Sequence, residues 1–154
     1  MIREIENGLK AIIERIVESK LLPSPDRIEK KIHVFTGYIP FENESYVTPA
    51  IAIRVNKGEN TLEKRVLNCH IVFQMYNDDS TSQAYDSLYE IGQLLVDKII
   101  EQGTVNQIAE ISPSIKWEVP EQQPVPYYIF DIDLQLISRK TYRTDVDDWI
   151  NGRE

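Results

Sequence analysis

The segment YYIFDIDLQLISR, Tyr127 to Arg139, decides the fold of this chain because its apolar and polar residues alternate. In a β-strand, successive side chains point to opposite faces of the sheet. One face would carry Tyr128, Phe130, Ile132, Leu134 and Leu136. The opposite face would carry Tyr127, Ile129, Asp131, Asp133 and Gln135. The pattern predicts a long strand with one face in a hydrophobic core.

A second long strand is predicted at RVLNCHIVFQMY, residues 65–76, which alternates in the same way. Its apolar face would carry Leu67, Cys69, Ile71, Phe73 and Met75. Shorter strands are predicted at KIHVFTGYI (31–39), AIAIRV (50–55) and SIKWEV (114–119). The polar segment NKGENTLEKR, 56–65, reads as a turn between two of these strands.

Two helices are predicted from apolar residues at helical spacing. Residues 1–18 form an amphipathic pattern that ends before Pro23 and Pro25, which cannot continue a helix. The second helix runs from about Ser80 to Gln102. Asp78 and Asp79 precede it as capping residues, where carboxylates meet the positive end of the helix.

These elements predict an α+β fold. We expect a mixed or mainly antiparallel sheet of four to five strands, with an N-terminal helix and one long central helix packed on one face. A chain of 154 residues fits one domain, so residues 1–154 are expected to form a single domain. The acidic C-terminal tail, 141–154, could be flexible.

Composition narrows the class of function. The net charge of −8 repels phosphates, so sequence-specific nucleic-acid binding and anionic membrane surfaces are disfavoured. No run reaches the roughly 18 apolar residues of a membrane span, and no secretory signal is recognisable at the N-terminus. Cys69 is the single cysteine, which excludes a disulfide within the chain and favours a reducing compartment.

Few residues suggest catalysis. Asp131 and Asp133 share a strand face and could hold a divalent cation or share acid–base work, yet the solvated face of a sheet produces the same pattern. Cys69 and His70 point to opposite faces, and a pairing of Cys69 with His33 across strands stays open. The glycine-rich phosphate-binding motifs are absent. We therefore expect no enzyme activity and no cofactor.

Two segments are candidate contact surfaces. Prolines fix φ and donate no backbone hydrogen bond, so residues 120–126 are expected to be extended and stiff. They could lie across a neighbouring subunit and could also form a rigid crossover between two strands of the same chain, since the two interpretations are compatible. The loop PFENESYVTP, 40–49, is the second segment. The candidate interface residues are Phe41, Tyr46, Pro120, Glu121, Gln122, Gln123, Pro124 and Pro126.

The stretch KWEVPEQQPVPYYIFDIDLQL, 116–136, resembles a family of small proteins encoded in the tail-assembly region of tailed phages and prophages. Members have a Lys-Trp-Glu-aliphatic-Pro segment, then Glu-Gln-Pro, then an aromatic-rich alternating strand. Upstream, two apolar strands around an acidic-polar turn and a long Leu- and Ile-rich helix also look alike. The resemblance covers about residues 46–140.

The resemblance implies a structural protein of virion assembly, a tail terminator or tail completion subunit at the head–tail junction. Such subunits close as rings, typically hexameric. The implied partners are further copies of this chain, the tail tube protein and the head–tail connector proteins. The implied location is the tail or neck of the virion, after assembly in the bacterial host cytoplasm. A head-side stopper or connector subunit is the nearest alternative within this class.

Two alternatives from other classes remain at this point. One is a small monomeric or dimeric adaptor or regulatory binding module that uses the same loop. The other is a metal-dependent hydrolase that uses Asp131 and Asp133.

Overall fold

The computed structural model describes residues 2–78 and 81–138. Two helices and three long strands form most of the molecule. The helices are α1 (Ile2–Val17) and α2 (Thr81–Gln102), and the long strands are β6 (Ala50–Asn60), β7 (Arg65–Tyr76) and β11 (Tyr127–Ser138). The short strands are β1 (Leu21–Pro23), β2 (Glu29–Lys31), β3 (His33–Thr36), β4 (Phe41–Glu42), β5 (Ser45–Tyr46), β8 (Thr104–Val105), β9 (Ala109–Ile111) and β10 (Lys116–Glu118).

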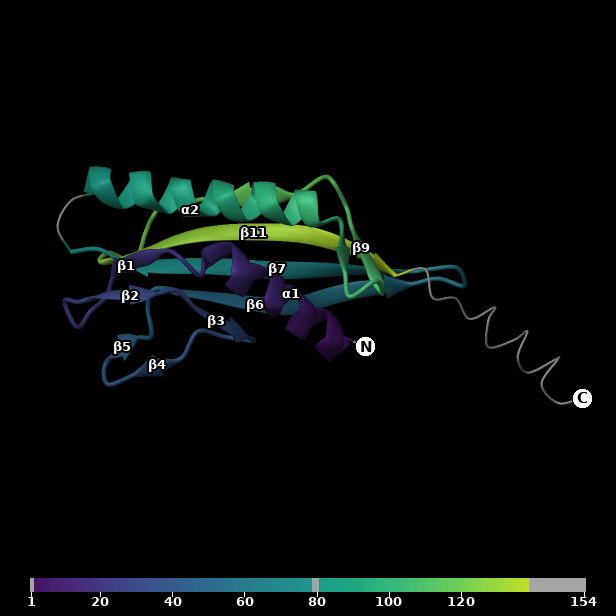
Figure 1. Cartoon of the computed structure of the whole chain (residues 1–154), viewed down its shortest axis with the longest axis horizontal. Helices are drawn as coiled ribbons and strands as arrows, with labels where there is room; N and C mark the ends of the chain where they lie inside the picture. Colours follow the sequence, from purple (N-terminus) through teal and green to yellow (C-terminus); the bar gives the residue numbers. More distant parts are fainter. Residues whose placement is uncertain (1, 79–80, 139–154) are drawn as a thin grey trace, which may run out of the picture.

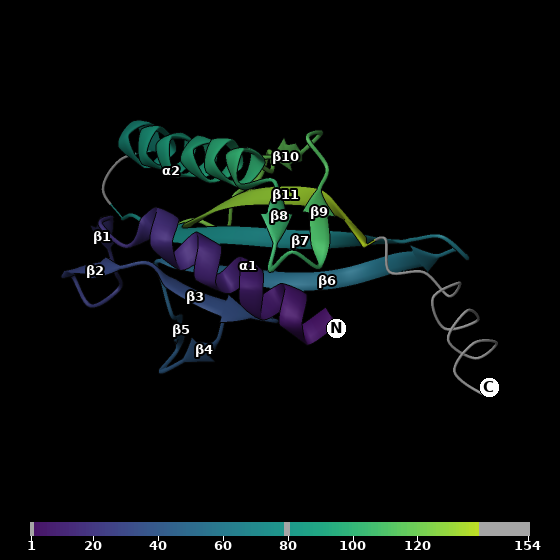
Figure 2. The same cartoon turned by 45° about the vertical axis from the view of Figure 1, so that its right-hand side comes forward.

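Seven strands form one curled, mixed sheet that resembles half of a barrel. The order is β3-β6-β7-β11-β9-β8, and β10 also pairs with β11 (Figure 1 and Figure 2). Strand β3 runs parallel to β6, whereas the other neighbours are antiparallel. The predicted fold class, with four to five strands, is therefore wrong.

The prediction missed strands β8 and β9, which lie between α2 and β10. They contain only two and three residues, too few for an alternating pattern to be visible. Asn106 and Gln107 connect them with φ angles of 50° and 61°, and the amide of Ile108 donates to the carbonyl of Val105. This is the geometry of a type I′ turn, which normally carries glycine. Because glycine is absent from this turn, the residues carry no hairpin signal.

Strand β6 is longer than predicted and continues through most of the segment that was interpreted as a turn. Asn56 has no partner in the register with β7, so it forms a bulge between Val55 and Lys57. The amide of Val55 donates to the Glu6 carboxylate of α1 at 3.0 Å. Glu6 is buried despite its charge, and it joins α1 to the bulge.

Both helices pack on the same face of the sheet, with α2 over β11 and α1 across β3 and β6 (Figure 2). Close approach depends on two glycines, because a Cβ atom at Gly8 would lie 2.6 Å from the Val105 side chain and one at Gly92 would lie 2.4 Å from the Phe130 ring. The largest fully buried core side chains include Phe73, Phe130, Ile5, Leu9, Ile51, Ile71 and Leu88.

Several predicted boundaries agree with the structure. The strand predicted at 65–76 is β7 at both ends, and the alternating segment begins at Tyr127 as β11 does. The capping role of Asp79 and the acidic tail at 141–154 lie outside the described residues. Within the described ranges, no helix is long and apolar enough to cross a membrane.

Candidate interaction surface

The second face of the sheet is covered by neither α1 nor α2. Cross-strand rows run over this uncovered face in the order β6, β7, β11. One row is Ala52, Val72 and Asp131, and the next is Arg54, His70 and Asp133. The β4–β5 hairpin stands out from the sheet near one end of this face (Figure 1). Ala52 is buried, whereas the other residues of these two rows are at least partly exposed and form a surface of charged and apolar side chains.

A run of aromatic rings connects the hairpin to β11. Phe41 contacts Tyr46 at a ring separation of 4.9 Å, and Tyr46 contacts Tyr127 at 5.3 Å. Tyr127 in turn contacts Tyr76 at 5.6 Å. The amide of Tyr46 also donates to the Tyr127 hydroxyl at 3.3 Å. Because Tyr127 directly follows Pro126, the structure brings the two sequence-predicted contact segments together.

Residues 119–126 form a compact loop between the antiparallel strands β10 and β11. The amide of Tyr127 donates to the Pro124 carbonyl at 2.9 Å, which closes a turn, and the amide of Asn77 donates to the Pro126 carbonyl at 3.0 Å. The predicted extended leader is therefore wrong. The segment connects β10 and β11 within one chain, and contact of its outer side with a neighbouring subunit stays a prediction.

Gln123 fastens this loop to β11. Its side-chain oxygen accepts from the Ile129 amide at 2.7 Å, and its side-chain nitrogen donates to the Pro120 carbonyl at 2.9 Å. Other predicted interface residues point outward: Glu121, Gln122 and Pro124 are exposed, and Pro126 is half-buried. Gln123 thus has a structural role in the loop, while its neighbours are free to make contacts.

His70 and Asp131 form a hydrogen-bonded pair on the uncovered face. The Nε2 atom of His70 lies 3.2 Å from an Asp131 carboxylate oxygen. Partial burial raises the pKa of Asp131 above its ordinary value, and His70 opposes this by favouring the ionised carboxylate. Asp133 lies on the same face, as predicted, and is exposed. No cluster of three or more His, Cys, Asp or Glu residues suited to a metal ion occurs among the described residues.

Cys69 lies on the helix-covered face and is fully buried. Burial, with a smaller effect from the Glu6 carboxylate, raises the pKa of its thiol to about 12. His33, on the edge strand β3, is exposed and contacts the Phe35 ring. The structure therefore does not bring Cys69 and His33 together as a nucleophile and base.

A hollow of about 270 Å³ opens on the uncovered face beside the β4–β5 hairpin. Its lining includes Tyr38, Arg54 and Gln74, which the sequence analysis did not single out. The Arg54 guanidinium lies 4.4 Å from the centre of the Tyr38 ring. Two features of the sequence point to this hollow. Arg54 is a cation at the end of an apolar run, and Gln74 is an amide on the polar face of β7.

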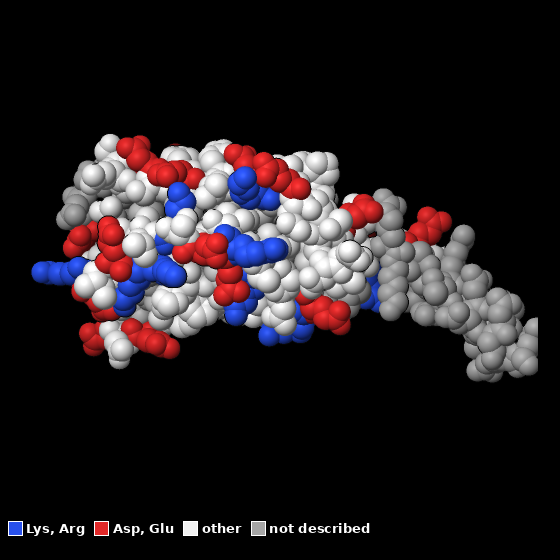
Figure 3. Space-filling model, in the orientation of Figure 1, with Lys and Arg blue, Asp and Glu red and all other residues white. Residues whose placement is uncertain are grey.

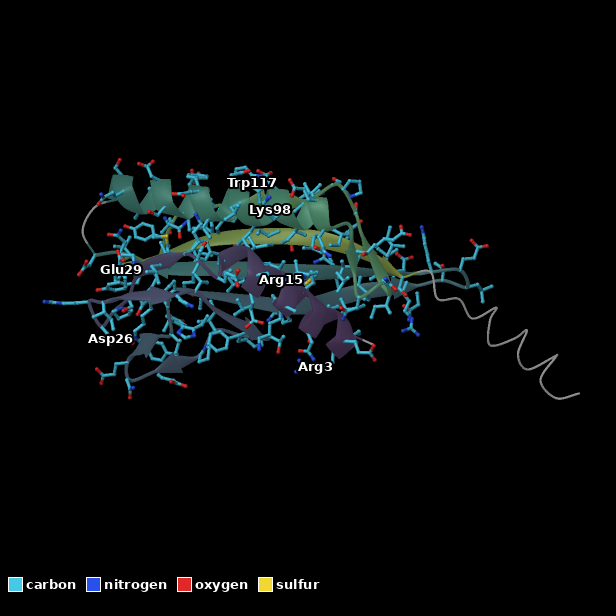
Figure 4. The ribbon with its side chains drawn as sticks, in the orientation of Figure 1. Arg3, Arg15, Asp26, Glu29, Lys98 and Trp117 are labelled. Atoms are coloured by element: carbon cyan, nitrogen blue, oxygen red, sulfur yellow. The ribbon has the colours of Figure 1, made fainter. Side chains whose placement is uncertain are left out.

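The helix-covered side carries a groove that is more open than the hollow on the uncovered face. A groove of about 470 Å³ runs between α1 and α2 beside Ile12 and Leu94, with Arg15 and Lys98 along it (Figure 4). Acidic and basic side chains are interspersed over this side (Figure 3). Behind α2, the half-exposed Trp117 of β10 stacks on Phe130 at 5.2 Å.

The fold and site define a small protein of two helices and a curled, mixed sheet that has one helix-covered and one uncovered face. No model of a known protein family matches the chain, and a search of the curated proteins finds no match. The functional interpretation therefore depends on the uncovered surface and on the resemblance of residues 46–140.

Proposed function

We propose that this protein is a ring-forming structural subunit of the head–tail junction of a tailed phage or prophage, a tail terminator or tail completion protein. The resemblance of residues 46–140 supports the class. The observation that carries the proposal is the uncovered sheet face with the aromatic hairpin beside it. Phe41 on this hairpin is 61 % exposed, and such a side chain normally marks a contact surface when others lie nearby.

A ring requires two different, complementary surfaces on each subunit. The outward side of the 119–126 loop and the β4–β5 hairpin supply one such surface, since Val125 and Phe41 are both largely exposed. The groove between α1 and α2 is a distinct surface on the helix-covered side. The proposed partners are neighbouring copies, the tail tube protein and the connector proteins.

The charge of the chain fits this role. Genome DNA passes through the opening of a junction ring, and a net charge of −8 on each subunit reduces adhesion of phosphates. The proposal assigns no catalytic step and no cofactor to the protein.

The first experiment is the absolute mass of the full chain in solution, by light scattering on a sizing column with and without magnesium. Six subunits of 17.9 kDa give about 107 kDa, and a particle of this mass is expected. If the chain is a monomer in solution, it is mixed with purified tail tubes. The ring is then expected to close on the tubes. A monomer that also fails to bind tubes contradicts the proposal and favours the adaptor class.

A substitution in the 119–126 loop tests the interface more directly. Gln122→Arg adds a bulky charge at an exposed position and is expected to prevent assembly while the thermal midpoint stays unchanged. Gln83→Arg, at an exposed position on α2, is the matched control. Gln123→Arg is unsuitable, because it removes the hydrogen bonds that hold the loop. Normal assembly of Gln122→Arg would exclude the loop from the interface.

A further inference from the structure

The hollow beside the β4–β5 hairpin has the composition of a binding pocket for a single side chain. Its floor is apolar, from Ala52 and Val72, and its walls include the rings of Tyr38 and Tyr46. Arg54 and Gln74 contribute polar groups from neighbouring strands. A few convergent polar groups in an otherwise apolar hollow are typical of ligand sites.

Two of these polar side chains form neither a hydrogen bond nor an ion pair within the described part of the chain. Gln74 is only 6 % exposed, and its side-chain amide makes no hydrogen bond with any of the described residues. Arg54 contacts the Tyr38 ring but forms no ion pair within the described part of the chain. An unpaired amide on an otherwise buried side chain that lines a hollow is available to hydrogen-bond a ligand there.

The charge of the missing group follows from the lining. Arg54 is an unpaired cation in a chain with an excess of acidic residues, and guanidinium groups bind carboxylates with paired hydrogen bonds. His70 also lines the hollow, but its Nε2 atom already contacts Asp131, which is not part of the lining. The donors left for a carboxylate are therefore the Arg54 guanidinium and the Gln74 amide.

The volume of the hollow indicates which kind of molecule carries the carboxylate. Pockets for drug-sized molecules usually measure about 300–1,000 Å³. A hollow of about 270 Å³ that is open to solvent fits one long side chain with its neighbouring backbone. A peptide segment can also lie along the exposed Tyr38 ring, which is 75 % exposed.

We propose that this pocket receives a glutamate side chain from an acidic peptide segment of a partner protein. The carboxylate pairs with Arg54 and Gln74, and the aliphatic part of the side chain contacts Ala52 and Val72. This inference goes beyond the ring, because the pocket can serve any partner that presents such a segment.

The test uses the peptide acetyl-Ala-Ala-Glu-Leu-Ala-amide, its twin with Gln in place of Glu, and free glutarate. Each probe is titrated into isotope-labelled full-length protein, and the NMR signals of the Gln74 amide and the Arg54 Nε group are followed. The Glu peptide is expected to shift both signals saturably. The Gln twin is expected to bind at least about tenfold more weakly, as is usual when a charged hydrogen bond is lost.

Matched variants locate the binding. Arg54→Met keeps the aliphatic stem and is expected to weaken the Glu peptide at least about tenfold. Arg15→Met, on α1, is expected to leave the affinity unchanged. Gln74→Met, similar in shape, provides a second test in case Arg54→Met unfolds. Equal binding of the two peptides, tighter binding of glutarate than of the Glu peptide, or no saturable shift would each overturn the proposal.

Discussion

Cys69 and Asp131 lie on opposite faces of the same pair of strands, and burial raises the pKa of both groups. The consequences differ because the raised pKa lowers the reactivity of the Cys69 thiol, whereas the raised pKa of Asp131 changes how stability depends on pH. Measurements on each group therefore test how deeply its face of the sheet is buried.

We expect the Cys69 thiol to be almost unreactive in the native protein. The thiolate is the reactive form, and a pKa of about 12 leaves a very small fraction of it at pH 8. Reaction with a disulfide reagent should be about a thousandfold slower than for an exposed thiol, and guanidinium chloride should restore it. Ser114→Cys in a Cys69→Ala background supplies the exposed control. Rapid reaction of native Cys69 would mean that the helices open readily.

Asp131 should make stability depend on pH in a defined direction. Its folded pKa is raised above 3.8, so its contribution to stability is complete below that value and is lost as pH rises through the folded pKa. Asp131→Asn should therefore gain stability relative to the native chain as pH increases from 3 to 6. Urea unfolding at several pH values measures this difference.

His70 provides the control for that result. Because His70 lowers the Asp131 pKa, His70→Gln should raise it further, as followed by carboxyl-carbon NMR. A decrease of the Asp131 pKa in His70→Gln would contradict the described geometry of the pair.

Among the elements, the contact of α2 with β11 depends on one small residue. A methyl group at Gly92 would lie 2.4 Å from the Phe130 ring, so Gly92→Ala should destabilise the fold by about 1–2 kcal/mol despite its better helix propensity. The cost should be smaller in a Phe130→Leu background, because the two sites are coupled. Gln83→Ala, exposed on the same helix, should change stability by less than about 0.5 kcal/mol.

The elements also show what the sequence could predict. β7 and β11 are long and alternate, so both were predicted, whereas the interface role of Phe41 and Tyr46 stays a prediction. β8 and β9 were missed because they are very short, and burial of Glu6 depends on a bulge in a distant strand. The pocket combines Tyr38, Arg54 and Gln74 only through cross-strand register and hairpin position, which no local pattern contains.

At the scale of the molecule, one core connects the two helices to the long strands and to the short strand β9. Unfolding should therefore be a single cooperative transition, as expected for one domain. Helical circular dichroism and Trp117 fluorescence should give the same midpoint in a Trp149→Phe background. Separate midpoints would show that β10, which carries Trp117, melts independently of the core.

The arrangement of long and short strands also affects association between copies. The three strands of 11 and 12 residues lie inside the sheet, whereas its outer strands, β3, β8 and β10, have two to four residues. Where β6 extends past β3, its outer edge carries Lys57, Glu59 and the bulge at Asn56. Short, charged and irregular edges are poor templates for uncontrolled strand pairing. Association of copies through the edges of the sheet is therefore disfavoured, which leaves contacts between copies to side chains.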